Sequence, residues 1–323
     1  MRLVLIGGSG FVGSNLVQAW VSGDFLNAVF DSILIIDNGS SGGHSRVEKH
    51  LSSRIRLLDM DAANAAELAN ELRREDFVIF LAANPDISKG YTEPRLDFQS
   101  GTVTAEAVAE ACRLCGVGYL FFSSGSGVYG DNSAGHLDEE SVTTLVVSPY
   151  AASKVAAEAL FSAYANMFGM QVGVARFANL VGPNQTHGVV FDFVRKLRAF
   201  PGTLQVLGDG HQTKSYLHVS DALRAVELIC NSMLTEPIQS STRFFNVSNV
   251  DVISVREIAE IVLEVGDLKE ASLAYTGGRA GWPGDVPRVH LSSSRIETTL
   301  GWRPRFSSAV AIRMSAHDEW ADT

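Results

Sequence analysis

Short apolar runs rich in β-branched and aromatic residues alternate with stretches of helical apolar spacing over the first 180 residues. Strands that are buried on both faces read as continuous apolar runs, whereas the helices that connect them show a period near 3.6. The alternation therefore predicts an α/β fold with a doubly wound parallel sheet. The expected strands carry RLVLIGG, SILIIDN, IRLLDMD, FVIFLAA, YLFFSSG and VGVARFA, and the expected helices include 14–22, 64–74, 95–116 and 150–168.

The pattern becomes irregular beyond Gly182, where loops such as LGDGHQTKS and TGGRAGWPGDVPR separate short helices. We predict two domains from this change, a first domain over residues 1–178 and a smaller C-terminal lobe that occupies most of 179–323. Segments 215–230 and 243–248 have the patterns of a helix and a strand that rejoin the first domain. The boundary is therefore not expected to be a single cut.

Composition narrows the class of protein. A hydrophobic content of 46% in 323 residues is sufficient for a sizeable core. The net charge of -10 disfavours a surface for nucleic acid or for anionic membranes, because their phosphates would be repelled. No stretch approaches the roughly 20 apolar residues that span a bilayer, and the N-terminal apolar run is too short for a signal peptide. We expect a soluble, cytoplasmic protein.

The three cysteines do not indicate a disulfide framework, because they are an odd number in a long chain. Cys112 and Cys115 form a CxxC pair, but the residues around them have helical apolar spacing and no second Cys or His pair is near. The pair therefore favours neither a redox site nor a metal site, and we expect no metal.

Gly7, Gly10 and Gly13 are spaced three apart in GGSGFVG, between the first expected strand and helix. Such a loop turns tightly, brings backbone N–H groups to a pyrophosphate and directs a helix N-terminus at its charge. The next strand ends at Asp37, whose carboxylate can accept hydrogen bonds from an adenosine ribose and would repel a 2′-phosphate. In this context the loop predicts a Rossmann site for NAD rather than NADP, in preference to an ordinary glycine turn.

Tyr150 and Lys154 are four residues apart in SPYAASK, at the start of an expected helix, and therefore lie on one face. A phenol is a poor base at neutral pH, and lowering its pKa by about three units requires roughly 4 kcal/mol of preferential phenolate stabilisation. A neighbouring ammonium and the positive ring of an oxidised nicotinamide can supply it. After the fifth strand of a dinucleotide-binding domain, the pair predicts an acid/base centre.

These motifs are part of a larger set that runs nearly from end to end. The set comprises GGSGFVG, Asp37, Asp59 in LLDMD, LAANP at 81–85, SS-x-x-x-VYG at 123–130, YAASK, RFANLVGP at 176–183, LGDGHQTKSYLHVSD at 207–221 and GWPGD at 281–285. Together they resemble the extended short-chain dehydrogenases/reductases, and within these most closely the UDP-glucose (UDP-galactose) 4-epimerases.

The resemblance implies an NAD-dependent 4-epimerase of a UDP-sugar, with UDP-glucuronate as the alternative substrate. Tyr150 would take the proton of the 4-hydroxyl while C4 gives hydride to NAD+, and Lys154 would hold the cofactor ribose and lower the Tyr150 pKa. The 4-keto sugar would then accept the hydride on its other face, so that NAD acts as a bound prosthetic group. The resemblance also implies a homodimer formed through helices 95–116 and 150–165.

The residues that carry these contacts follow from the same resemblance. Expected cofactor contacts are Gly7, Gly10, Phe11, Val12, Asp37, Asn38, Asp59, Met60, Leu81, Ala82, Ala83, Ser123, Tyr150 and Lys154. Expected substrate contacts in the C-terminal, substrate-binding lobe are Asn179, Val190, Lys214, Arg279 and Asp285.

The chain departs from the family pattern beside the catalytic strand. The hydroxyl that helps to polarise the 4-oxygen falls on Gly125, between Ser124 and Ser126. Neighbouring side chains in a strand point to opposite faces, so neither serine inherits the role automatically. Both are kept as catalytic candidates, and a bend at the glycine would favour Ser126. Gly101 also replaces a usual Asn.

A further departure lies in the C-terminal lobe, where Trp282 stands at the Arg of the RxGD motif and Arg279 precedes it. The sequence disfavours two other functions. Sister enzymes that dehydrate the sugar carry an Asp-Glu pair immediately before VYG, and Ser126-Gly127 lacks that acid and base, which disfavours a 4,6-dehydratase. A non-catalytic NAD-binding regulator is disfavoured by Tyr150 and Lys154, because cofactor binding alone does not require this pair.

Overall fold

The computed structural model describes residues 1–26, 28–131, 136–236 and 241–321, and the contacts between them divide the chain into two compact units. Unit 1 comprises Met1–Gly125, Pro149–Arg176 and Leu223–Phe245. Unit 2 comprises Ser126–Ser148, Phe177–Ala222 and Asn246–Thr323.

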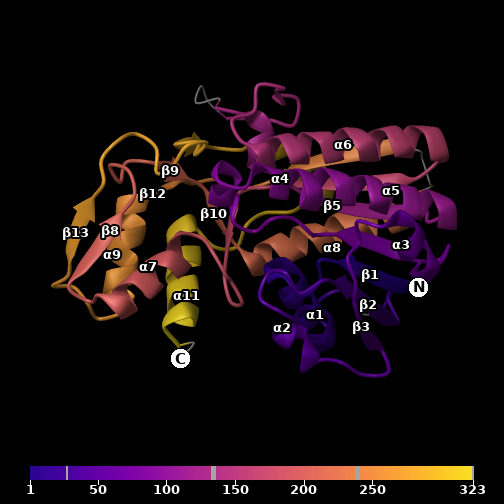
Figure 1. Cartoon of the computed structure of the whole chain (residues 1–323), viewed down its shortest axis with the longest axis horizontal. Helices are drawn as coiled ribbons and strands as arrows, with labels where there is room; N and C mark the ends of the chain where they lie inside the picture. Colours follow the sequence, from indigo (N-terminus) through magenta and orange to yellow (C-terminus); the bar gives the residue numbers. More distant parts are fainter. Residues whose placement is uncertain (27, 132–135, 237–240, 322–323) are drawn as a thin grey trace. The chain divides into compact units, whose positions relative to one another are not determined.

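A seven-stranded sheet in the order β11-β6-β5-β4-β1-β2-β3 forms the middle of unit 1 (Figure 1). Strands β1 to β5 pair in parallel. The α/β, doubly wound fold expected from the sequence is confirmed, and each of its six apolar runs forms a strand of this sheet. The strands are β1 (Arg2–Ile6), β2 (Ser32–Asp37), β3 (Ile55–Asp59), β4 (Phe77–Phe80), β5 (Tyr119–Gly125), β6 (Gln171–Phe177) and β11 (Ser241–Val247).

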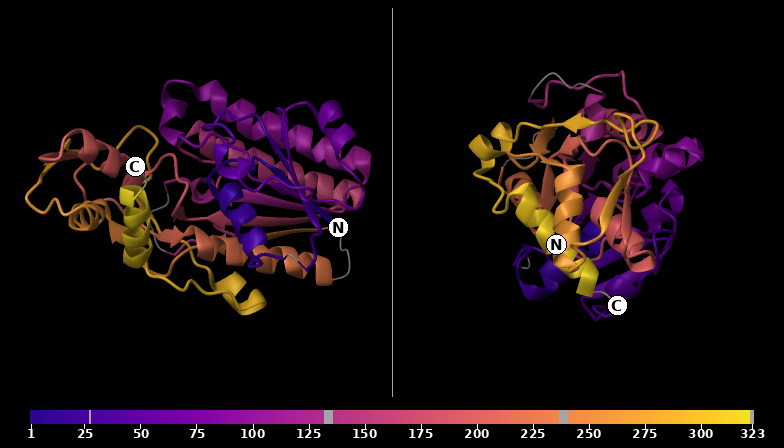
Figure 2. Two further views of the ribbon diagram at one scale, coloured as in Figure 1. Left: turned by 90° about the horizontal axis from the view of Figure 1, so that it is seen from below. Right: turned by 90° about the vertical axis from the view of Figure 1, so that its left-hand side faces the viewer.

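Helices cover both faces of this sheet, with α5 and α6 on one face and α8 on the other (Figure 2). The core beneath α5 and α6 contains aromatic contacts between Phe80 and Phe122 and between Phe122 and Phe161, with ring centroids 5.6 Å and 5.1 Å apart. The helices are α1 (Phe11–Ser22), α2 (Ser45–Glu48), α3 (Ala65–Glu71), the 3-10 turn η1 (Ile87–Tyr91), α4 (Pro94–Asp97), the π-helical η2 (Phe98–Val103), α5 (Thr104–Cys115), α6 (Pro149–Phe168) and α8 (Val219–Thr235).

Unit 2 has its own core, in which Phe193, Leu204, Ile258 and Ile312 are buried between α7, α9, α11 and β8. Its strands are short and form small sheets. They are β7 (Asn179–Val181), β8 (Thr203–Val206), β9 (Thr213–Lys214), β10 (Tyr216–His218), β12 (Ile253–Ser254), β13 (Ser272–Tyr275) and β14 (Arg288–Val289). Its helices are the 3-10 turn η3 (Ser126–Tyr129), α7 (Val189–Ala199), α9 (Val255–Val265), α10 (Ser294–Leu300) and α11 (Ser308–Ala321).

The segment Ser126–Ser148 belongs to unit 2, whereas the sequence pattern places it inside a domain spanning 1–178. Long-range backbone pairing accounts for the difference. Leu137 forms a parallel bridge with Leu291, its N–H donates to the carbonyl of His290, and its own carbonyl accepts from the N–H of Ser292. Local periodicity carries no information about such a pairing.

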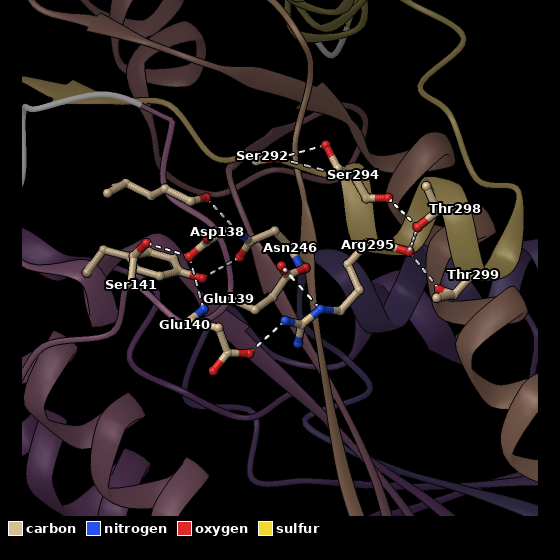
Figure 3. A network of polar contacts seen from close by, with 12 residues as sticks. Asp138, Glu139, Glu140, Ser141, Asn246, Ser292, Ser294, Arg295, Thr298 and Thr299 are labelled. Atoms are coloured by element: carbon tan, nitrogen blue, oxygen red, sulfur yellow. Dashed lines mark hydrogen bonds and ion pairs between the residues drawn. The ribbon is translucent and has the colours of Figure 1, made fainter.

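Asn246 and Arg295 fix this segment within unit 2 (Figure 3). The buried Asn246 donates its backbone N–H to Glu139 at 2.8 Å and its side-chain amide to the carbonyl of Leu137 at 2.9 Å, and its Oδ1 accepts from the Tyr129 hydroxyl at 2.5 Å. Arg295 forms ion pairs with Glu139 at 3.5 Å and with Glu140 at 2.7 Å.

The other expected domain limits also differ in detail from the units. The second segment of unit 2 begins at Phe177 rather than at 179. Helix α8, expected over 215–230, divides between the units at Leu223. The strand expected at 243–248 is β11, at the edge of the seven-stranded sheet. Among the described residues, no helix combines the length and the apolar character that crossing a membrane requires.

Candidate active site

The glycine loop between β1 and α1 has the shape that an anion requires. Gly7 has φ +82°, and a Cβ on it would lie 2.5 Å from the backbone nitrogen of Ala82. A Cβ on Gly13 would lie 2.5 Å from the Cα of Gly8. Gly10 caps α1 without a side-chain hydrogen bond, so the first N–H groups of the helix receive no partner from their cap. These positions fit a pyrophosphate at the helix N-terminus.

Asp37 places a negative charge at the end of β2, next to this loop. Its carboxylate accepts from the backbone N–H of Ser9 at 2.9 Å and of Gly39 at 2.8 Å. Asp59 lies opposite Asp37 in the register of β2 and β3, and its Oδ1 is 3.7 Å from the Nε2 of His44. A carboxylate held by backbone donors fits a ribose diol and disfavours a 2′-phosphate.

The other expected cofactor residues lie at the carboxyl ends of the parallel strands or at the start of α1. The N–H groups of Leu81 and Ala82 both donate to the carbonyl of Ile6, which ties the end of β4 to the end of β1. The winding direction reverses between β1 and β4, and ligands of such sheets bind at this switch point. Phe11 and Val12 open α1. Asn38 and Met60 directly follow β2 and β3, Ala83 lies three residues after β4, and Ser123 lies in β5, two residues before its end.

Tyr150 and Lys154 lie in the first turns of α6. The Nζ of Lys154 donates to the carbonyl of Ser123 at 2.7 Å and lies 5.5 Å from the ring centroid of Tyr150 and 4.8 Å from that of Phe122. The structure therefore brings together the ammonium, the phenol ring and the end of β5. Lys154 is buried, whereas Tyr150 is partly exposed.

Burial shifts the pKa values of both members of this pair in the chain alone. Burial lowers the pKa of Lys154 to about 8, although the charge of Glu158 opposes the shift. Burial raises the pKa of Tyr150 to about 12, and the negative charge of Asp97 adds to the rise. The lowering of the phenol pKa expected from the sequence combines the ammonium of Lys154 with the positive ring of an oxidised nicotinamide, so it remains a prediction for the chain with cofactor bound.

Ser124 is used elsewhere and leaves the set of catalytic candidates. Its buried hydroxyl donates to Glu158 at 2.6 Å, and the same carboxylate receives two bonds from the guanidinium of Arg176, at 2.9 Å and 2.7 Å. The strand alternation directs Ser124 under α6, into this buried ion pair.

Ser126 remains a candidate. Strand β5 ends at Gly125, and Ser126 opens the 3-10 turn η3, so the two-residue alternation of side chains no longer applies at this point. Ser126 is partly exposed.

Of the expected substrate residues, Lys214 and Asp285 form one polar group in unit 2. The Lys214 Nζ donates to Asp285 at 2.6 Å and lies 5.4 Å from the ring centroid of Trp282. Asn179 donates to the carbonyl of Ser215 at 3.3 Å. Arg279 lies in an exposed loop.

The side chain of Val190 is not available for a ligand. It is completely buried in the core of unit 2, where α7 packs, so a substrate contact at Val190 would have to come from its backbone. The indole N–H of Trp282, in contrast, is buried and has no hydrogen-bond partner among the described residues.

Two charged groups near Tyr150 were missed from the sequence. Glu158 follows Lys154 by four residues, and this spacing on a helix that is otherwise apolar and small was the available signal. Asp97 gives a weaker signal, because a single acid near the end of a short helix usually faces solvent. Both carboxylates are buried.

The cysteines and acidic residues contribute no metal-binding cluster. Within the described ranges, no group of three or more His, Cys, Asp or Glu side chains is arranged to hold a metal ion. Cys112 is buried, and burial raises the pKa of its thiol. The Cys115 thiol lies 3.1 Å from the carbonyl of Ala69.

Comparison with known proteins adds to this geometry. Residues 3–239 match the family described as NAD dependent epimerase/dehydratase. A UDP-glucose 4-epimerase of Mycolicibacterium smegmatis is 31% identical over 322 residues, which cover 97% of this chain and 96% of that protein. A crystal structure of a UDP-galactose 4-epimerase has 33% identity and a TM-score of 0.85, with 98% of each chain covered. A dTDP-glucose 4,6-dehydratase of Streptomyces venezuelae, solved with NAD bound, has 26% identity and a TM-score of 0.89, covering 100% of this chain and 98% of that one.

The position of Asp37 leads to a prediction about cofactor choice. Replacing Asp37 with Ser removes the carboxylate at the end of β2, so we expect NAD affinity to fall about tenfold or more, the effect of a lost charged hydrogen bond. Affinity for NADP relative to NAD should rise. Calorimetric titration with both dinucleotides measures the change, with the exposed Asp61→Ser as a control for charge. Unchanged NAD affinity in Asp37→Ser would contradict the assignment.

Proposed function

We propose, since this chain belongs to the NAD dependent epimerase/dehydratase family, that it is a 4-epimerase of a UDP-sugar of the UDP-glucose/UDP-galactose type. NAD is its cofactor. The observation that carries the proposal is the pair Tyr150 and Lys154, one turn apart on α6, with the ammonium held by the carbonyl of Ser123 at the end of β5. Similarity to 4-epimerases over nearly the whole chain supports the same reaction.

In this mechanism Tyr150 accepts the proton of the sugar 4-hydroxyl and later returns a proton to the same oxygen. A bound nicotinamide would supply the hydride acceptor for C4 and, after the 4-keto sugar has turned over, the hydride donor for its opposite face. The substrate thus undergoes no net oxidation, and the chain has to retain the cofactor through the cycle. The glycine loop and Asp37 would hold its pyrophosphate and ribose.

The pKa of Tyr150 decides when it can act as a base. At about 12, the phenol stays protonated in the chain alone. Lys154, with a pKa of about 8, is largely protonated at neutral pH, and a positive nicotinamide near the phenol would add to its charge. Proton removal by Tyr150 therefore depends on a bound, oxidised cofactor, which couples the acid/base step to the hydride step.

Ser126 would donate a hydrogen bond to the 4-oxygen in place of the hydroxyl that the family pattern has at position 125, where this chain has glycine. In unit 2, Asn179, Lys214 and Asp285 would contact the nucleotide diphosphate. Lys214 is the cation suited to the diphosphate, and it must exchange its bond to Asp285 for one to phosphate or share both.

The sequence Ser126-Gly127 favours epimerisation over dehydration, because dehydration requires an acid and a base beside C5 and C6. The same two small residues would leave room for a carboxylate at C6. UDP-glucuronate is therefore the second candidate substrate.

Incubation of the purified protein with UDP-glucose, UDP-galactose, UDP-N-acetylglucosamine and UDP-glucuronate tests the proposal. We expect NMR to show the C4 epimer of at least one sugar, with no net consumption of NAD.

Tyr150→Phe should lower kcat by about 10²-fold or more, because it removes the acid/base group. Tyr164→Phe, on the same helix with its hydroxyl on Glu110 at 3.3 Å, is the control and should keep activity.

Several outcomes would contradict the proposal. A 4-keto-6-deoxy product would indicate a dehydratase. No product from any sugar, with NAD still bound, would favour a non-catalytic regulator or another chemistry.

Ser126→Ala gives a separate prediction about polarisation of the 4-oxygen. We expect kcat to fall by about 10²-fold, with little change in the thermal unfolding temperature, because the partly exposed hydroxyl would act on the substrate. Ser141→Ala, in the same segment with its hydroxyl on Asp138, is the matched control. Full activity in Ser126→Ala would remove Ser126 from the mechanism.

We further propose that the chain forms a homodimer through α5 and α6. Leu114, Met167 and Phe168 of these helices are exposed by 54%, 74% and 45%, which is costly for an isolated surface. Light scattering should give twice the chain mass of 34.8 kDa. Met167→Glu should produce monomers, whereas Phe200→Glu, at an exposed site in unit 2, should not. A wild-type monomer at micromolar concentration would refute the dimer.

A further inference from the structure

Asp97 is a buried carboxylate with an incomplete set of partners. It ends α4, directly before the π-helical η2, and only 1% of its surface is exposed. Its Oδ1 accepts from the side-chain amide of Asn84 at 2.8 Å. Its Oδ2 is buried and has no hydrogen-bond partner among the described residues. A buried carboxylate with one neutral donor is energetically unusual.

Asp76 and Glu158, two other buried carboxylates of the chain, are each paired with an arginine. Asp76 receives Arg2 at 2.6 Å, and Glu158 receives Arg176 at 2.7 Å. Such pairing offsets the loss of hydration of a buried charge. Asp97 is bound by the neutral side-chain amide of Asn84, whereas these acids are bound by a cation. The negative charge of Asp97 is therefore less neutralised by its hydrogen-bond partner.

The surroundings of Asp97 are the first turn of α6. A Cβ on Gly90 would lie 2.5 Å from the Asp97 Oδ2 and 3.8 Å from the Cδ of Pro149, the residue before Tyr150. The Asp97 Oδ2 and the start of α6 thus both lie next to the position that a side chain on residue 90 would occupy. This position is open because residue 90 is glycine. One turn after Asp97, Gly101 packs directly on Ser153, whose hydroxyl donates to the carbonyl of Tyr150 at 2.7 Å.

The ionisation of the two groups agrees with this placement. After burial, the charge of Asp97 is the cause that raises the pKa of Tyr150. Burial in turn raises the pKa of the Asp97 carboxyl, and the bond from Asn84 opposes that shift. Two negative charges in one buried region disfavour each other.

We propose that Asp97 is a positioning residue whose buried negative charge opposes ionisation of Tyr150 and so keeps the phenol available as a proton donor. The charge effect itself does not depend on the substrate. Its use in catalysis rests on the proposed epimerase function, in which Tyr150 must return a proton to the 4-oxygen as readily as it removes one. An acid/base group serves both directions best when its pKa is near the working pH.

Other charged groups of unit 1 around this site act in known directions. On α6, Lys154 favours the phenolate and Glu158 offsets part of the charge of Lys154. On η1, Lys89 is exposed, and Asp86 precedes it with its carboxylate on Ser88. The segment η2, Phe98–Val103, carries no titratable side chain. Asp97 is thus the buried acid that opposes Lys154 at the phenol.

Asp97→Asn tests the charge directly. The amide has nearly the same shape, so removal of the negative charge should lower the pKa of Tyr150 by about one unit, the size of a nearby-charge effect. Ultraviolet titration of tyrosinate measures it in the chain without substrate, with Tyr150→Phe variants of both backgrounds subtracted to isolate this one phenol. Glu264→Gln, which removes a carboxylate paired with Arg313 at 2.8 Å in unit 2, is the control and should leave the titration unchanged.

Kinetics then test the use of this charge. In Asp97→Asn the acid limb of the kcat profile should move to lower pH, with KM nearly unchanged. Asp97→Leu, of similar volume and without polar atoms, gives the same two readings if the amide variant does not fold. Coincident tyrosinate titrations of wild type and both variants would overturn the proposal. A shifted titration in a protein with no epimerase activity would instead contradict the proposed function and leave the charge effect intact.

Discussion

The structure depends on how α6 buries polar side chains against the sheet. Tyr150, Lys154 and Glu158 follow one another at intervals of four residues, and Lys154 and Glu158 bind groups of β5 and β6. A charged group can be buried there only if the sheet supplies a partner. The carbonyl of Ser123 receives Lys154, while Ser124 and Arg176 receive Glu158. Ser123 and Ser124, two consecutive residues of β5, thus fix the position of α6 along the strand and its rotation about the helix axis.

This constraint gives the acid/base pair its chemical character. The ammonium is neither solvated nor paired directly with a carboxylate, because Glu158 is already engaged by Arg176. Its charge is therefore free to act on a neighbouring phenol. Asp97, at the end of α4, opposes it, because its negative charge raises the pKa of the same phenol. The ionisation of Tyr150 is a balance between these two charges and the charge state of a bound nicotinamide.

Much of unit 1 could be predicted from the sequence, because strands buried on both faces and amphipathic helices leave clear periodic signals. The seven-stranded sheet contains all six expected strands, and α6 begins one residue before the expected 150. Site features that depend on long-range contacts were not accessible. The partner of Ser124 lies 34 residues away in the chain, and the bridge between Leu137 and Leu291 reassigned a whole segment. The burial of the Val190 side chain within unit 2 could not be predicted, because it depends on residues that are distant in the sequence.

The contact between Gly101 and Ser153 constrains how this sequence can change. A side chain at position 101 would collide with the Ser153 hydroxyl, which in turn is bound to the carbonyl of Tyr150. An asparagine at this position would therefore require a shift of the turn that holds the acid/base residue. The two positions form an epistatic pair, in which the effect of a substitution at one depends on the residue present at the other.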